Sequence, residues 1–299
     1  MLRSIIAITA SVALVAAPPA FAERLHDALE AYALYQNDVS TMLDVDIENA
    51  RTVDAAIERL TRHDPNSVSR GWIAYGALTA ARSPRFADSI DDRVHENGRR
   101  DVLALLRGDT GYARRQRNAD QAIDLILSAA GADSARTAQA GLRYDRFART
   151  AGSVQLASSG SANLPGPTQL SADMLDRLRG TGRVSRTRIA YGERGYWDAL
   201  SGRAGAAPRA RGGNEARDYA SVTDHMLTLA AIVIADGERS ERRRVDSLLD
   251  EPLTQQCMEM QRLQLRQCLS VSIDGAERAY CLARHALDGP GSCFSAVAR

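Results

Sequence analysis

Four cysteines lie within the last 43 residues of this 299-residue chain, and the rest of the chain contains none. They are Cys257, Cys268, Cys281 and Cys293. An even number of cysteines in an exported chain favours disulfide bonds, which form in oxidising compartments and are rare in the cytosol. If the chain is exported, the sequence predicts a C-terminal region locked by two disulfides.

The N-terminus predicts export. A single arginine, Arg3, precedes a run of apolar or small residues from 5 to 17, and the segment Ala20-Phe21-Ala22 follows two prolines. This is the pattern of a secretory signal peptide with a small-residue cleavage site. The alternatives are an uncleaved anchor or a buried helix, but a run of 13 residues is too short to span a bilayer. We therefore expect residues 1–22 to be a cleaved signal peptide of a bacterial periplasmic or secreted protein, with no transmembrane segment in the mature chain.

Apolar residues recur at steps of three and four along most of the mature chain, which predicts an all-α fold. Aromatic residues make up only 5% of the chain, so its core must be built largely from aliphatic side chains. Trp72, on a helix otherwise lined by small residues, is expected in that core. Helices are expected at 23–60 (one bent helix or two), 71–81, 84–97, 102–106, 118–154, 219–236, 240–249, 253–269 and 274–287.

A stretch rich in serine, glycine and proline at 158–167 interrupts this pattern and is typical of a linker. We therefore expect an N-terminal helical domain at 23–157 and an irregular, arginine-rich segment at 158–213. A C-terminal helical region with the four cysteines follows at 214–299.

Helix geometry limits how the cysteines can pair. Three pairings are possible, but Cys257 and Cys268 share one expected helix and would stand about 16 Å apart along its axis, too far for a disulfide. The midpoints of 268 and 281 and of 257 and 293 both fall near 275, at the expected turn between the last two helices. An antiparallel hairpin then pairs Cys268 with Cys281 and Cys257 with Cys293. Reduction is expected to loosen this region and leave the N-terminal domain folded.

The layout is similar to the twin-cysteine helical hairpins of mitochondrial import, although the cysteines of each helix are separated by ten and eleven residues rather than nine. We infer shared geometry without kinship. A redox-active pair and a metal site are the alternatives; the chain lacks a Cys-x-x-Cys motif and short ligand spacings.

All 38 basic residues are arginine, which indicates either a GC-rich genome or selection for forked donors that bind phosphate and carboxylate. Without residues 1–22 the chain has 37 arginines and 37 acidic residues, a net charge of zero that argues against nucleic-acid binding. Ten arginines between 177 and 217 face only three acids there, a local charge of +7. Aromatic residues lie among them, a combination typical of binding surfaces. The candidate binding residues are Arg183, Arg186, Arg188, Arg194, Tyr196 and Trp197.

This segment has an alternative interpretation: its arginines pair with the chain's own acids and Trp197 fills the core. If it is a surface, its expected partner is an anionic envelope component or an acidic protein surface.

The segment 231–249 resembles the Ala-Asp-Gly-Glu helix turn of TerB-like tellurite-resistance domains. That resemblance implies a cation held near Asp236 and Glu238, although Arg239 and residues 242–244 depart from the family pattern. No catalytic residue and no cofactor is predicted, because the five histidines are scattered and no nucleophile or phosphate-loop motif is present.

The sequence leaves three functions open. The first is a non-enzymatic exported protein that binds an envelope partner. The second is a peptidoglycan-type hydrolase using paired carboxylates, which requires a cleft with one buried acid of raised pKa. The third is a cation-binding stress protein with its site at the turn of Asp236 to Glu238.

Overall fold

The computed structural model describes residues 23–158 and 214–298, and these ranges are all-α, as the sequence predicts. The expected signal peptide and the candidate residues Arg183, Arg186, Arg188, Arg194, Tyr196 and Trp197 lie outside them. The described α-helices are α1 (Glu23–Asp44), α2 (Ala50–Thr61), α3 (Pro65–Ala81), α4 (Pro84–Asn97), α5 (Arg99–Gly108), α6 (Ala119–Ser158), α9 (Ala220–Ile234), α10 (Arg242–Leu249), α11 (Pro252–Val271), α12 (Gly275–Cys281) and α13 (Gly289–Ser295). No β-strand occurs in these ranges, only an isolated bridge between Glu215 and Ala298.

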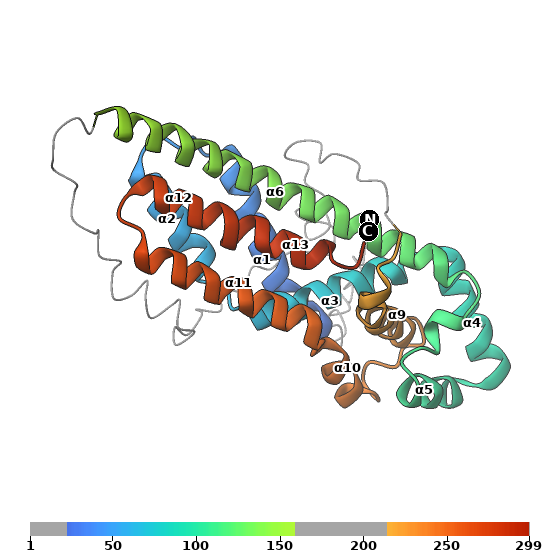
Figure 1. The fold of residues 1–299 in the computed structure, drawn as a ribbon. Helices are drawn as coiled ribbons and strands as arrows, with labels where there is room; N and C mark the ends of the chain where they lie inside the picture. The colour runs from blue at the N-terminus through green and yellow to red at the C-terminus, as the bar shows by residue number, and fades with distance from the viewer. Residues whose placement is uncertain (1–22, 159–213, 299) are drawn as a thin grey trace, which may run out of the picture.

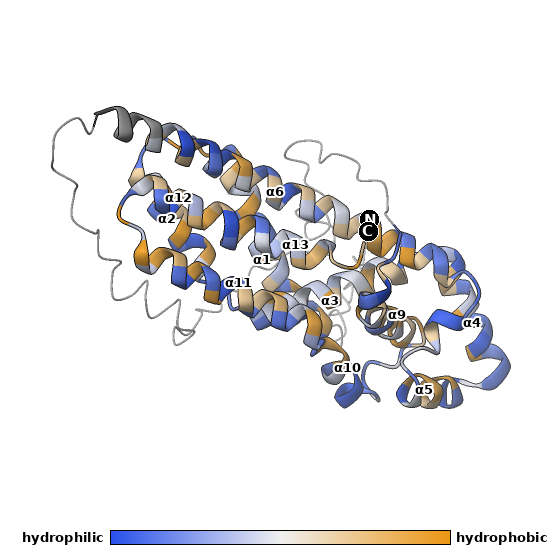
Figure 2. Ribbon diagram, in the orientation of Figure 1, coloured by the Kyte–Doolittle hydropathy of each residue, from blue (hydrophilic) through white to orange (hydrophobic). Residues whose placement is uncertain are grey.

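Two short 3-10 turns, η1 (Ala113–Arg115) and η2 (Arg217–Tyr219), and one π-helical turn, η3 (Leu282–Asp288), complete the elements. Their arrangement is an elongated bundle (Figure 1). The long helix α6 runs along one side, with the hairpin of α11 and α12–α13 beside it, and α4, α5 and α10 lie toward the opposite end from the hairpin turn. Hydrophilic residues colour much of α4 and α10 at the edge of the molecule (Figure 2).

Helix boundaries follow local sequence signals. Asn49 caps α2 by accepting from the backbone N–H groups of Arg51 and Thr52, which separates α1 from α2. Asp64 caps α3 in the same way, with Pro65 at its first position. The expected helix after Ser83 is confirmed as α4, which ends before Gly98 at a positive φ of 84°.

Helix α3 lies at the centre of the core because its small residues allow close packing. A Cβ atom added at Gly71 would stand 2.5 Å from the backbone oxygen of Ala28, so only glycine permits this approach to α1. Trp72 is completely buried, as the sequence predicts. Its ring contacts those of Tyr32, Tyr75 and Phe294 at centroid distances of 5.5–6.0 Å.

The disulfide pairing predicted from the hairpin is confirmed. Cys257 bonds to Cys293 and Cys268 to Cys281, with Cα–Cα distances of 5.8 and 5.6 Å. The expected turn is also in place, since α11 ends at Val271 and α12 begins at Gly275.

The helices before and after the central segment share one hydrophobic cluster. It extends from Leu25 on α1 to Phe294 on α13 and Val297, and α3 packs against both α1 and α9. None of the helices in the described ranges combines the length and apolar character that a membrane span needs.

Candidate functional site

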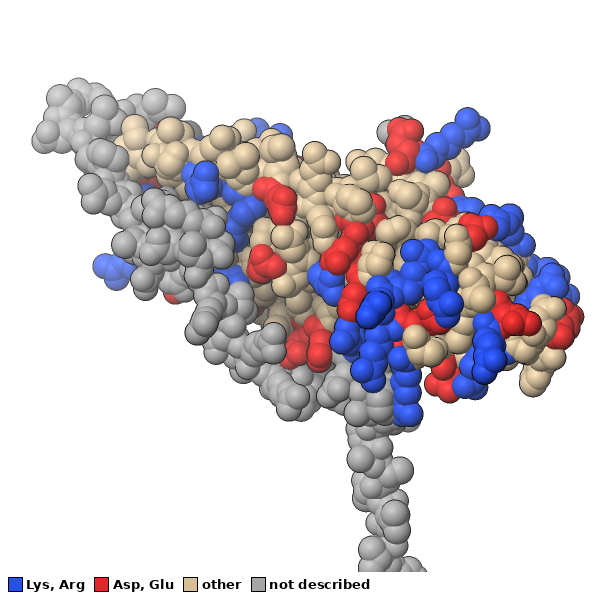
Figure 3. Space-filling view, turned by 90° about the horizontal axis from the view of Figure 1, so that it is seen from below, with Lys and Arg blue, Asp and Glu red and all other residues tan. Residues whose placement is uncertain are grey.

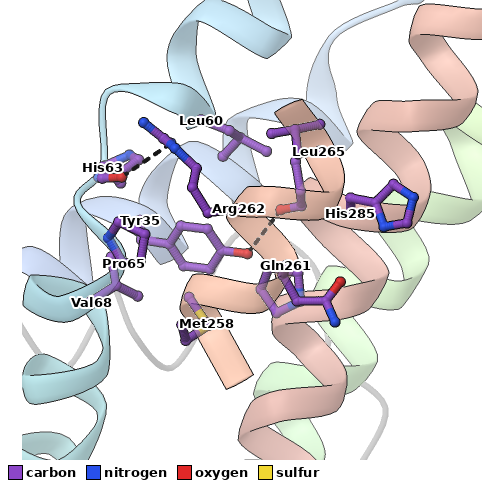
Figure 4. Close-up of a pocket in the computed structure, with 12 residues that line it drawn as sticks. Tyr35, Leu60, His63, Pro65, Val68, Met258, Gln261, Arg262, Leu265 and His285 are labelled. Atoms are coloured by element: carbon purple, nitrogen blue, oxygen red, sulfur yellow. Dashed lines mark hydrogen bonds between the residues drawn. The ribbon is translucent and has the colours of Figure 1, made fainter. Parts of the chain in front are cut away.

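A small pocket lies where α11 and the π-helical turn face the ends of α2 and α3 (Figure 4). Its wall is mostly apolar, and its polar groups come from five side chains on α1, α11, η3 and the loop between α2 and α3. The apolar wall includes Leu60, Val68, Met258 and Leu265. The polar side chains are Tyr35, His63, Gln261, Arg262 and His285.

The π-helical turn positions one side of this pocket. In η3 the backbone N–H of Gly289 donates to the carbonyl of Arg284, five residues earlier. Pro290 has no N–H to donate to the carbonyl of Ala286, four residues earlier. The buried hydroxyl of Tyr35 donates to that carbonyl at 3.2 Å (Figure 4). An interior carbonyl that the proline cannot pair thus finds its donor on α1.

The helix that carries this turn extends further than the sequence pattern predicts. The last helix is expected to end at 287, whereas it continues past Gly289, Pro290 and Gly291 as α13 to Ser295. Gly289 allows the side chain of Gln261 on α11 to pack directly against its Cα. The continuation carries Cys293 to Cys257 on the facing helix.

Tyr35→Phe should therefore lower the free energy of unfolding by about 1–3 kcal/mol, because a buried carbonyl loses its partner. In a Pro290→Ala background the loss should be smaller, since the new N–H can take the Ala286 carbonyl. Urea unfolding of the four proteins measures this coupling. Tyr280→Phe is the control, because Tyr280 is exposed and its loss of a hydroxyl should change little. Equal losses in both backgrounds would contradict this role for Pro290.

His63 is held by a buried carboxylate. Its Nε2 lies 2.7 Å from Oδ2 of Asp38. Oδ2 also accepts from Arg62, and Oδ1 accepts from Arg59, both at the end of α2. Burial alone would raise the pKa of Asp38, but hydrogen bonds from His63, Arg62 and Arg59 outweigh it and lower that pKa. Asp38 therefore stays ionised and fixes the end of α2 against α1. The sequence signal for this cluster was the placement of basic residues three and four apart at 59, 62 and 63.

Arg262 is also engaged by the end of α2. Its guanidinium donates to the carbonyl oxygens of Thr61 at 2.6 Å and of His63 at 3.4 Å, where a helix leaves acceptors unpaired. Burial lowers its pKa to about 10, with the charge of Asp64 opposing the shift, so the group remains charged at neutral pH. Burial, together with nearby Arg284, lowers the pKa of His285. Tyr35 and Arg262 thus hold backbone carbonyls and His63 holds Asp38, and no carboxylate, serine, threonine or cysteine is among the lining residues.

One buried acid with a raised pKa does exist, but it lies in the interior. Asp133 on α6 is only 1% exposed, accepts from the Tyr32 hydroxyl at 2.5 Å and pairs with Arg136 at 3.0 Å. Burial raises its pKa to about 6, against the lowering effect of the Arg136 charge and of the hydrogen bonds. The hydrolase hypothesis required such an acid in a cleft, whereas Asp133 does not line the pocket.

The Asp236–Glu238 turn is closed by backbone hydrogen bonds and by an arginine. Asp236 has a positive φ of 50°, and the next N–H, of Gly237, returns to the carbonyl of Ile232 at 2.8 Å. The Asp236 carboxylate pairs with Arg99 of α5 at 3.3 Å. Burial raises the pKa of Glu238, and the charge of Asp236 raises it further. Among residues 23–158 and 214–298, no three histidine, cysteine or acidic side chains gather as a metal site. Thermal shifts with added calcium or magnesium would test the cation hypothesis.

Comparisons of the chain with family models, with curated proteins and with solved structures each found no match.

Two buried or partly buried arginines bind acids from distant parts of the chain. Arg114 pairs with Glu215 at 2.7 Å and with Asp224 at 2.5 Å, which anchors the chain where the second described range begins. Arg278 pairs with Asp54 at 2.7 Å and ties α12 to α2. At these positions arginine is an internal cross-link. By contrast, Arg100 on α5 and Arg242 and Arg243 on α10 are exposed and form no ion pair with another described residue.

Proposed function

We propose that this protein is an exported, non-catalytic protein that binds an anionic partner in the cell envelope through surface arginines. The observation that carries the proposal is the contrast between its two kinds of arginine. Buried or partly buried arginines pair with acids, as Arg114, Arg136 and Arg278 do. Arg100, Arg242 and Arg243 are exposed and form no ion pair with another described residue. Such groups are available to phosphate or carboxylate.

The disulfides support the same proposal, because they agree with an oxidising compartment outside the cytosol. The pocket gives no support to hydrolysis, since no carboxylate lines it and the acid with the raised pKa, Asp133, lies elsewhere.

Envelope association is the direct test. Protein lacking residues 1–22 should co-sediment with envelope fragments at low salt and be released as salt rises, because exposed charges are screened beyond about 8 Å at 0.15 M. Peptidoglycan incubated with the wild type and with Asp133→Asn should remain undigested by both. Failure to associate at any salt concentration would refute the proposal. Digestion by the wild type alone would favour the hydrolase.

The central segment is tested separately. If Arg183, Arg186, Arg188 and Arg194 belong to the binding surface, replacing all four with glutamine should abolish envelope association. The free energy of unfolding should then change by less than about 0.5 kcal/mol per site. Lower thermal stability with unchanged association would mean that these arginines pair internally. Trp197→Ala is a second test of the same question. If Trp197 lies in the core, this substitution should lower the free energy of unfolding by about 3–5 kcal/mol.

A further inference from the structure

We infer that the end of the molecule formed by α5 and α10 docks on a membrane surface that displays anionic phosphate headgroups. This inference rests on the proposed function and names the partner class and the surface. Figure 3 shows arginines gathered over this end, with carboxylates between them. We call this the α5–α10 surface and define it by residues 99–108 and 236–244.

The charge of this surface is positive although the mature chain is neutral. It holds seven arginines and four acids, which leaves +3. Two of the acids are already neutralised within the surface, since Asp236 pairs with Arg99 and Glu241, which is buried, pairs with Arg107.

The turn before α10 packs against α5, so the charges of this surface act as one group. Leu103 of α5 packs against Gly237, and Arg244 of α10 donates to the Thr110 hydroxyl at 2.6 Å, just beyond α5. These contacts and the Arg107–Glu241 pair hold the turn before α10, and the start of α10, against α5 and the residues just beyond it. Arg100, Arg242 and Arg243 then face solvent from this fixed backbone.

This combination suits lipid headgroups better than a protein. A protein partner presents acids at fixed positions and gains affinity from arginines held in place by their neighbours. Lipid phosphates diffuse within the membrane plane and can meet exposed arginines at any spacing. The pocket lined by Tyr35 and Arg262 lies between α2, α3, α11 and η3, away from this surface.

Co-sedimentation with lipid vesicles tests the inference. Protein lacking residues 1–22 should bind vesicles containing about a third phosphatidylglycerol and should not bind pure phosphatidylcholine vesicles. One basic residue near an anionic surface contributes about fivefold in binding, so R100Q/R242Q/R243Q should weaken binding on the order of 100-fold. Its thermal midpoint should match that of the wild type, because all three side chains are exposed.

The matched control is R51Q/R146Q/R266Q. It removes the same charge from exposed positions on α2, α6 and α11, toward the hairpin end of the bundle. This control should retain vesicle binding. Equal loss in both triple variants would overturn the inference, because net charge rather than the α5–α10 surface would then explain binding. Envelope association without binding to either vesicle would overturn the lipid partner and leave the proposed function standing, with an acidic protein as the partner. If the protein binds neither envelope fragments nor vesicles, both the proposed function and the lipid partner are refuted.

Discussion

Replacing all four cysteines with alanine should destabilise the molecule by about 6 kcal/mol. In the chain-entropy model the outer bridge, with a sequence separation of 36, contributes about 4 kcal/mol, and the inner bridge, with a separation of 13, about 3 kcal/mol. The bridges are nested, so the inner one shortens the outer loop and the sum is slightly less. Since domains are stable by about 5–15 kcal/mol, this loss is a large share of the total.

Loss of the disulfides should destabilise the whole bundle rather than the hairpin alone. Phe294, next to Cys293, packs against Tyr32, Tyr35 and Trp72 on α1 and α3. Opening the hairpin therefore exposes the aromatic core of the N-terminal helices. The sequence suggested that those helices would remain folded after reduction, but a shared core predicts one cooperative transition.

Denaturant unfolding followed by near- and far-UV circular dichroism measures this. The two signals should fall together, at a lower midpoint than in the wild type. C268A/C281A alone should cost less than C257A/C293A, because it opens the shorter loop. Two separate transitions, with the N-terminal helices persisting to the wild-type midpoint, would show that the hairpin is an independent unit.

Asp133→Ala should cost about 3–5 kcal/mol, because it leaves a buried arginine without its counter-charge. Arg136 donates to both Asp133 and Gln36, and Gln36 donates in turn to the Tyr32 hydroxyl at 3.0 Å. Removing the carboxylate therefore also leaves the Tyr32 hydroxyl without its acceptor.

The control is an exposed ion pair with the same spacing of three residues along a helix. Glu96 pairs with Arg93 three residues away, and both side chains are about half exposed. Glu96→Ala should change the unfolding free energy by less than about 1 kcal/mol, as exposed ion pairs do. Chemical denaturation of both variants gives the comparison. Similar losses in the two would mean that the buried pair is no stronger than a surface one.

The same carboxyl should make stability depend on pH. Its folded pKa of about 6 lies above the ordinary value of 3.8, so the folded protein holds the proton more tightly than the unfolded chain. The proton on Asp133 therefore adds to the free energy of unfolding below about pH 4. This contribution is lost as pH rises through 6, a change of about 3 kcal/mol. Asp133→Asn should remove this pH dependence. The unfolding free energy of the wild type should therefore fall relative to that of Asp133→Asn as pH rises from 4 to 6, and the difference between the two proteins should be constant outside that interval. Parallel curves from pH 4 to 7 would contradict the raised pKa.

Much of the fold could be predicted from sequence because its signals are local. Apolar spacing located the helices, Pro84 after Ser83 located the start of α4, and the cysteine midpoints fixed the hairpin register. The burial of Trp72 followed from the small residues around it.

The polar core could not be predicted in this way. Tyr32 and Asp133 are 101 residues apart, and each looks like one ordinary position on an amphipathic helix. Only the packing of α1 against α6 brings them together. Likewise, Gly289-Pro290-Gly291 favours a helix end unless a donor such as Tyr35 is supplied from elsewhere in the fold. The binding surfaces are harder still, because an exposed arginine and an ion-paired arginine look alike in a sequence.

The π-helical turn has a consequence for how this chain can vary in length. Each residue added to an α-helix turns the following part by about 100°, and a π-helical turn absorbs roughly one extra residue. Removing one residue from 282–288 would restore a regular helix but rotate α13 by about that angle. Cys293 would then point away from Cys257, and Phe294 away from the aromatic core. In any relative that keeps the outer disulfide, the number of residues between the two cysteines of this helix should therefore be kept as well.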